Sequence, residues 1–154
     1  MAAELKIRAA TPADVPVIVS LIRELAEYEK AAPGALSLTE DLLHESLFGV
    51  RPAVEALIAS LGDEVAGYAL FFHNFSSWRG KRGLFLEDIF VRPERRGRGI
   101  GKSLFVEVQR IARERGCARM EWLVLDWNQT AIDFYKAQGA EPLDGWTTFR
   151  LNLT

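Results

Sequence analysis

Cysteine and histidine are scarce in this chain of 154 residues, which has one cysteine, Cys117, and two histidines, His44 and His73. A single thiol cannot form an internal disulfide, and this usage suits the reducing cytoplasm, where we expect the protein to reside. It also excludes a zinc site built from cysteines, and neither histidine stands at a spacing typical of metal ligands. We therefore predict no metal.

Long apolar runs and a strong excess of one charge are also missing. Nineteen basic and twenty-one acidic residues leave a net charge of -2, so no general attraction to nucleic acid or an anionic membrane is expected. No segment reaches the length needed to span a bilayer, and the N-terminus lacks a basic start followed by an apolar run. Since 49% of the residues are hydrophobic, we expect a soluble protein whose residues 1–154 form a single domain.

Hydrophobic periodicity predicts a chain that mixes strands and helices. Period-2 alternation predicts strands at residues 4–9, 53–60, 65–73, 83–91, 119–125 and 145–153. Helical spacing predicts helices at residues 12–25, 38–48, 99–115 and 128–138, the first two capped by Thr11 and by a capping box of Ser37 and Glu40. The early hairpin and the later strand–helix–strand units predict an α/β fold with a central mixed, mostly antiparallel sheet of six to seven strands flanked by four helices.

The most informative segment leads from a strand ending at Val91 through a basic, glycine-rich loop into a helix. Glycines at a helix entrance let backbone N–H groups surround an anion, and the helix dipole favours negative charge there. The order Arg96-x-x-Gly99-x-Gly101 differs from the dinucleotide fingerprint and from the P-loop. A solvated loop that only caps the helix is the alternative, but the position between strand and amphipathic helix favours a phosphate site.

This segment resembles the R/Q-x-x-G-x-G/A signature of the GNAT superfamily of N-acetyltransferases, whose turn binds the pyrophosphate of acetyl-CoA. Asn128, which we expect to cap a helix, and Tyr135, seven residues later, strengthen the likeness. The resemblance implies that Asn128 contacts the cofactor and that Tyr135 is the general acid, since a phenol with a pKa of about 10 can protonate a departing thiolate. Packing of the helix against the sheet is the alternative role for Tyr135.

The attacking amine needs the opposite help. An alkyl ammonium with a pKa of about 10.4 is neutral only about once in a thousand at pH 7, so its deprotonation must be assisted by a base or made easier by desolvation. Glu87 and Asp88 are the candidates, and because neighbouring strand residues point to opposite faces, we expect only one of them on a given side. A structural salt bridge is the alternative.

A narrower likeness covers nearly the whole chain. The segments at residues 7–14, 21–29, 38–43, 86–91 and 126–128 resemble the diamine (spermidine/spermine) N-acetyltransferase family, which also includes thialysine acetyltransferases. Ser76 stands where the polyamine enzymes carry an acidic residue. The family likeness implies a homodimer, with acceptor residues contributed across the interface.

The same resemblance implies a role for each site residue. The catalytic residues would be Glu87, as base through water, and Tyr135. The acetyl-CoA site would comprise Ile89, Phe90, Val91, Arg96, Gly97, Arg98, Gly99, Ile100, Gly101, Lys102, Asn128, Gln129, Thr130, Ala131 and Gln138. The acceptor site would comprise Tyr28, Glu29, Trp78, Asp88, Glu121, Trp122 and Asp144, acidic and aromatic groups that suit a cationic amine.

We therefore predict an acetyl-CoA-dependent N-acetyltransferase that acts on a small amine such as a diamine, a polyamine, thialysine or lysine. A second hypothesis keeps the fold but changes the acceptor to a protein, an amino acid or an antibiotic. A third is a non-catalytic protein that senses acetyl-CoA.

Overall fold

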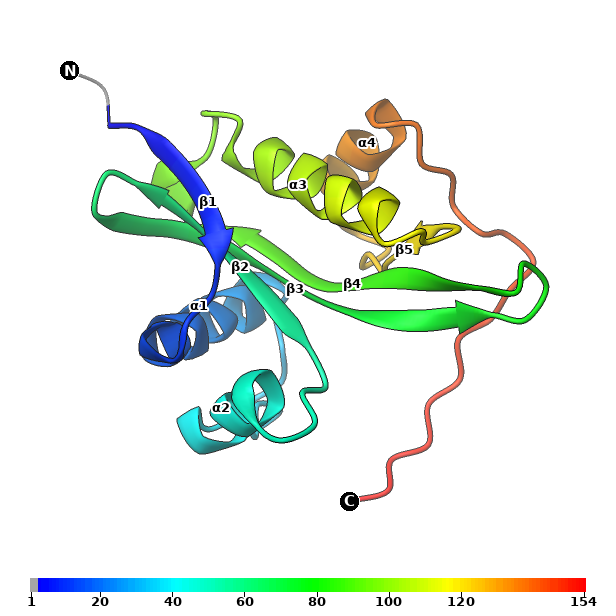
Figure 1. Cartoon of the computed structure of the whole chain (residues 1–154), viewed down its shortest axis with the longest axis horizontal. Helices are drawn as coiled ribbons and strands as arrows, with labels where there is room; N and C mark the ends of the chain where they lie inside the picture. The colour runs from blue at the N-terminus through cyan, green and yellow to red at the C-terminus, as the bar shows by residue number, and fades with distance from the viewer. Residues whose placement is uncertain (1–2) are drawn as a thin grey trace. The chain divides into compact units, whose positions relative to one another are not determined.

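A computed structural model describes residues 3–154 of the chain (Figure 1). Its internal contacts divide it into two compact units, one extending to Leu123 and the other running from Val124 to Thr154. The expected single domain stays a prediction.

The first unit is built on one mixed sheet of five strands in the order β1-β2-β3-β4-β5. The strands are β1 (Leu5–Ala9), β2 (Glu55–Leu61), β3 (Glu64–Ser76), β4 (Lys81–Val91) and β5 (Met120–Glu121). The first four pair antiparallel, and β5 pairs parallel with β4. The predicted mixed, mostly antiparallel sheet is confirmed, although it has five strands and not six or seven.

Helices cover both faces of this sheet. They are α1 (Val15–Tyr28), α2 (Glu40–Phe48) and α3 (Ile100–Glu114), with short 3-10 turns η1 (Pro12–Asp14) and η2 (Pro93–Arg95). Helices α1 and α2 lie on one face and α3 lies on the other (Figure 1). Between α1, α2 and the sheet is a core that includes Ile18, Leu21, Ile58, Tyr68 and Phe90.

The entrance to α1 shows how local sequence fixes an element. The backbone N–H of Thr11 donates to Asp14 Oδ2 at 2.7 Å, so the predicted Thr11 cap is confirmed as part of a capping box. Arg8 on β1 donates twice to the same carboxylate, at 2.7 and 2.9 Å. These bonds, with the Arg8 guanidinium first among them, lower the pKa of Asp14 to about 2.

The predicted capping box of Ser37 and Glu40 is wrong. Helix α2 begins at Glu40, and its cap is Thr39, whose hydroxyl accepts a hydrogen bond from Leu42 N at 3.2 Å. A threonine directly before the helix can reach the N–H three residues on, whereas Ser37 lies too far upstream.

The second unit contains α4 (Gln129–Ala137), and residues 138–154 form neither helix nor strand. The strand predicted at residues 145–153 is therefore wrong, and the one predicted at 119–125 shortens to Met120–Glu121. Alternating apolar residues specify a strand only when a partner supplies hydrogen bonds. Trp146, Phe149 and Leu151 are 70%, 92% and 84% exposed.

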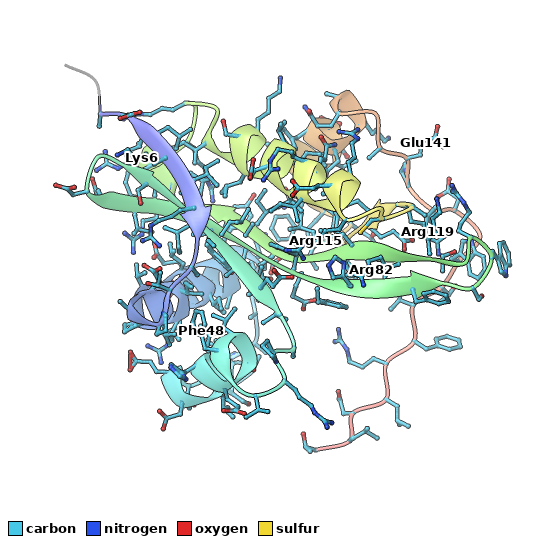
Figure 2. All side chains as sticks on the ribbon, viewed as in Figure 1. Lys6, Phe48, Arg82, Arg115, Arg119 and Glu141 are labelled. Carbon is cyan, nitrogen blue, oxygen red and sulfur yellow. The ribbon has the colours of Figure 1, made fainter. Side chains whose placement is uncertain are left out.

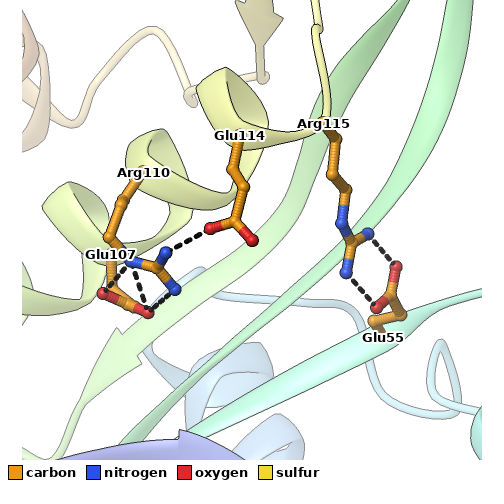
Figure 3. Close-up of polar contacts among 5 residues, drawn as sticks. All are labelled: Glu55, Glu107, Arg110, Glu114 and Arg115. Carbon is orange, nitrogen blue, oxygen red and sulfur yellow. Dashed lines mark hydrogen bonds and ion pairs between the residues drawn. The ribbon is translucent and has the colours of Figure 1, made fainter.

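Several charged side chains on the surface of the first unit form ion pairs with one another. Arg110 on α3 forms ion pairs with Glu107 and Glu114, and Arg115 forms a bidentate pair with Glu55 on β2 (Figure 3).

Arg82 lies near the β3–β4 hairpin (Figure 2), and its carbonyl oxygen accepts a hydrogen bond from Ala118 N at 2.9 Å.

Within residues 3–154, no helix is long and apolar enough to cross a bilayer. No group of three or more His, Cys, Asp or Glu side chains that could hold a metal ion lies in the same part of the chain.

Candidate active site

The site begins with an irregularity in β4. The β3–β4 register passes from Leu70 opposite Asp88 to Phe71 opposite Leu86, which leaves Glu87 without a partner. Such a β-bulge redirects side chains and interrupts the alternation of a strand. The charges of both Glu87 and Asp88 act on the buried phenol of Tyr68. The bulge interrupts the regular alternation from which opposite faces were expected for these two carboxylates.

Three carboxyl groups, Glu29, Glu87 and Asp88, form what we call the carboxylate cluster. Glu29 caps the C-terminal end of α1, while the other two lie on β4. Tyr68 on β3, whose side chain is fully buried, donates a hydrogen bond to Asp88 Oδ2 at 2.9 Å. The cluster thus joins two strands and the end of a helix.

The three carboxyl groups of this cluster repel one another when they are ionised. Burial raises the pKa of Asp88 to about 6; the Tyr68 hydrogen bond opposes the rise, and the charges of Glu87 and Glu29 add to it. Burial and the charge of Glu87 also raise the pKa of Glu29. A bound cation would relieve this repulsion, so the cluster suits a positively charged ligand.

At the far end of β4, residues 96–102 form an open turn. Gly97 and Gly99 have φ of 81° and 74°, the left-handed region that favours glycine, and nothing lies within 4 Å of a Cβ built at either position. Across residues 3–154, no protein acceptor takes a hydrogen bond from the backbone N–H groups of residues 99–102. The first bond of α3 runs from Ser103 N to Gly99 O at 3.0 Å.

The charge of this turn complements its geometry. Arg98 and Lys102 are exposed, and neither forms an ion pair with any residue that the structure describes, unlike Arg110 on the same helix. Free N–H groups at a helix start together with unpaired cations make an anion site, and they fit a diphosphate. Ile100 is buried, at 2% exposed, so only its backbone is available to a ligand. A Cβ built on the next residue, Gly101, would lie 3.7 Å from Val91 Cγ2.

Arg96, predicted to bind pyrophosphate, makes contacts elsewhere. Its Nε donates to Val91 O at 2.9 Å, and its guanidinium lies 4.8 Å from the ring centroid of Tyr28 and 5.4 Å from that of Phe90. These are cation–π distances. Arg96 therefore links the turn to the end of α1, one residue before Glu29.

The outer backbone edge of β4 is open beyond the start of the strand. Among the residues described, β4 pairs with β5 only at Leu84 and Phe85. The carbonyl oxygen of Phe90 points toward β3, since it would lie 2.4 Å from a Cβ built on Gly67 of that strand. Backbone groups of successive residues point to opposite edges, so those of Ile89 and Val91 point away from β3.

Three residues predicted for the acceptor site lie outside the carboxylate cluster. Trp78 is 85% exposed at the tip of the β3–β4 hairpin, and seven strand residues at about 3.3 Å each place that tip roughly 20 Å from Asp88. Glu121 pairs with Arg119 at 3.3 Å, and Trp122 packs edge-on against Phe105 with ring centroids 5.2 Å apart.

Ser76, beside the hairpin tip, is buried. Its hydroxyl accepts a hydrogen bond from Arg79 N at 3.1 Å, so it stabilises the turn.

The remaining predicted residues belong to the second unit. Asn128 caps α4 as predicted, its Oδ1 accepting from Ala131 N at 3.3 Å. Gln129 Nε2 donates to Asp133 at 2.7 Å, and half-buried Tyr135 lies edge-on to Phe134 with centroids 5.3 Å apart. Three further predicted site residues lie at the two ends of α4 and beyond it: Thr130 and Asp144 are exposed, and Gln138 is half-buried.

Tyr68 was not predicted for the site. A tyrosine within the apolar run of β3 reads as core, and its burial confirms that reading. The signal that was available is chemical, because a buried phenol needs a hydrogen-bond partner.

Comparison with known proteins identifies the family. The model of the acetyltransferase (GNAT) family matches residues 20–140. The chain is 41% identical to thialysine N-epsilon-acetyltransferase of Bos taurus, covering 94% of this chain and 90% of that protein. It is 32% identical to L-ornithine N5-acetyltransferase of Arabidopsis thaliana, covering 95% and 83%.

A solved structure of an integron cassette protein from the mobile metagenome of V. cholerae has the same fold. Its TM-score is 0.78 at 25% identity, covering 96% of this chain and 92% of that one. The glycine turn, the α/β sheet and these relatives agree: the chain belongs to the acetyltransferase (GNAT) family and is an N-acetyltransferase.

Proposed function

We propose that this enzyme transfers the acetyl group of acetyl-CoA to the primary amine of a small cationic acceptor, by direct attack within a ternary complex. The observation that carries the proposal is the layout of β4. Its bulge bears Glu87 and Asp88, and its end leads directly into the basic glycine turn. One strand thus connects a site for a cation with a site for a diphosphate.

GNAT acetyltransferases in general use acetyl-CoA as donor, and the turn fits its pyrophosphate. Backbone N–H groups of residues 97–102, with Arg98 and Lys102, would bind the phosphates. The outward backbone groups of Ile89 and Val91 would bind the pantetheine arm. From the second unit, the family likeness adds Asn128, Gln129, Thr130, Ala131 and Gln138.

Over the whole reaction the acceptor ammonium must lose two protons and the departing sulfur must gain one, while acetyl-CoA provides an activated thioester. Glu87 would accept the proton of the acceptor ammonium, directly or through water. The amine nitrogen then forms a bond to the acetyl carbon, and as the carbon–sulfur bond breaks the nitrogen releases its second proton to solvent. Tyr135 would donate a proton to the departing sulfur.

The acceptor we favour is the side-chain amine of a small amino acid. Two relatives are named for thialysine and L-ornithine, which are amino acids that end in a primary amine. Ser76, where polyamine enzymes carry an acidic residue, is buried in a turn and offers no charge to a second distant ammonium. The carboxylate cluster would bind the reacting end.

We also propose that the enzyme works as a homodimer. Phe149, Leu151 and Leu153 are 84–92% exposed, and exposed apolar side chains that gather in one segment are typical of an interaction surface. Trp78 lies too far from the carboxylate cluster to act in its own chain, so a second copy could supply it. Light scattering should give twice the monomer mass of 17.3 kDa; a monomer at assay concentration would contradict this part.

The test is an assay of coenzyme A release with acetyl-CoA and thialysine, ornithine, lysine, a diamine and spermidine. We expect turnover with the amino acids, and no release with any amine would contradict the function. Arg98→Gln and Lys102→Gln should each raise the KM for acetyl-CoA about fivefold to tenfold. Arg110→Gln, which removes a paired guanidinium from the same helix, should leave it unchanged.

A further inference from the structure

The hydrogen bond between Tyr68 and Asp88 has no part in the mechanism above, yet it is costly to build. Tyr68 lies in the core between α1, α2 and the sheet, and its side chain is 0% exposed. A phenylalanine would fill that space without needing a hydrogen-bond partner. Its hydroxyl instead donates to Asp88 Oδ2 at 2.9 Å, across from β3 to the bulge of β4.

The surroundings of Asp88 explain what this bond controls. The negative charges that act on Asp88 come from Glu87 beside it on β4 and from Glu29 at the end of α1. Arg96, stacked on the rings of Tyr28 and Phe90, is not among the charges that shift the pKa of Asp88. Within residues 3–154, the Tyr68 hydroxyl is the group that stabilises the ionised form of this carboxyl.

We propose that Tyr68 is a positioning residue for the acceptor site, which fixes Asp88 toward a cationic amine, and that amine binding expels a proton from Asp88 into solvent. The inference rests on the proposed function, because it takes the amine to bind at the carboxylate cluster. The added ammonium charge supplies the favourable partner that the free cluster lacks. Amine affinity then depends on pH through Asp88.

The pH range follows from the position of this titration. Since the pKa of Asp88 is about 6 in the free protein, about half of the molecules carry the proton at pH 6 and about a tenth at pH 7. An alkyl ammonium with a pKa of about 10.4 keeps its charge throughout this range. Proton release should therefore approach half a proton per amine at pH 6 and almost vanish by pH 8.

Two measurements on the full chain test the proposal. Calorimetry of thialysine binding to the protein with coenzyme A, at pH 6 in two buffers of different ionisation enthalpy, counts the protons released. Wild type should release about 0.5 and Asp88→Asn close to zero, while Asp63→Asn, an exposed control in the β2–β3 turn, should match wild type. Equal release from Asp88→Asn and wild type would overturn the proposal.

Kinetics of Tyr68→Phe separate positioning from a merely structural role. Loss of the hydroxyl should raise the pKa of Asp88 further, so kcat/KM for the amine should fall about threefold to tenfold at pH 6.5 and recover by pH 8.5. The fall should lie mainly in KM. A deficit equal at both pH values, or none at either, would overturn the role of Tyr68.

Failure of the proposed function gives a different result. Wild type would then neither bind nor acetylate an amine at any pH, which overturns both claims together. Thermal unfolding of Tyr68→Phe shows whether the variant is folded, and the wild-type proton count stands without it.

Discussion

Two aspartates of the first unit, Asp14 and Asp88, have opposite environments. Asp14 receives two hydrogen bonds from the Arg8 guanidinium and one from the backbone of Thr11, and its pKa falls to about 2. Asp88 receives one from a neutral phenol and lies near Glu87 and Glu29, and its pKa rises to about 6. The first carboxylate is fully satisfied within the fold, and the second is not.

The difference separates a structural charge from one held ready for a ligand. A satisfied carboxylate stabilises the fold and has nothing left to offer. A carboxyl group crowded by like charge costs stability when it ionises, and that cost is recovered when a cation arrives. The two aspartates have the same formal charge when ionised, so only their hydrogen-bond partners and neighbouring charges distinguish them.

The largest expected effect is on Glu87, the member of the carboxylate cluster at the bulge itself. Glu87→Gln should lower kcat about 10²-fold or more with little change in the KM for acetyl-CoA, because it removes the base and leaves the turn intact. Single-turnover kinetics would measure the chemical step. A loss confined to KM would assign Glu87 to binding instead.

Replacing the two aspartates should give opposite phenotypes. Asp88→Asn should raise the KM for the amine about tenfold at pH 8 while leaving thermal stability equal or higher, because an ionised group under repulsion is removed. Steady-state kinetics and a melting curve on the same preparation check both halves. Reduced stability with unchanged KM would break the comparison.

Asp14→Asn should do the reverse. We expect a loss of about 1–2 kcal/mol in the free energy of unfolding at pH 7, with kcat and KM close to wild type. Urea unfolding measures the loss, and Asp63→Asn in an exposed turn is the matched control. An inactive but stable variant would show that Asp14 had been misassigned.

The pH dependence of stability should carry both signatures. The folded pKa of Asp14, about 2, lies below its unfolded value of about 3.9, so its contribution is complete above pH 4 and is lost as the pH falls toward 2. The raised pKa of Asp88 has the opposite sign, and stability should decline as the pH rises from about 4 to 6. In urea unfolding, Asp14→Asn should remove only the loss of stability as the pH falls toward 2. Asp88→Asn should remove only the decline in stability between about pH 4 and pH 6.

The smallest effect is expected for Arg96. Because its guanidinium stacks on Tyr28 and Phe90, Arg96→Gln should raise the KM for the amine as well as for acetyl-CoA, each about twofold to fivefold. Initial rates with each substrate varied in turn would show it. A change in the acetyl-CoA KM alone would mean that Arg96 serves only the phosphates.

Sequence patterns predicted the parts of this molecule that depend on neighbours in the chain. The glycine turn, the Asn128 cap and the parallel pairing of β4 with β5 follow from local chemistry and from connection rules. The adjacent acids Glu87 and Asp88 were visible as candidates for the same reason.

Features that depend on contacts between distant segments could not be predicted in the same way. The bulge arises from the register between β3 and β4, and it interrupts the alternation of β4 at Glu87 and Asp88. Tyr68 lies 20 residues from its partner, and its sequence context shows only a core strand. The segment at residues 145–153 has strand periodicity but forms no strand, because periodicity alone does not specify a neighbouring strand.

The most direct measurement is a carboxyl-detected NMR titration of Asp14 and Asp88, with and without thialysine. The account predicts a pKa of about 6 for Asp88 that falls when the amine is added, and a pKa of about 2 for Asp14 that does not move. An Asp88 that titrates below pH 4, or one whose pKa is unchanged by saturating amine, would contradict it.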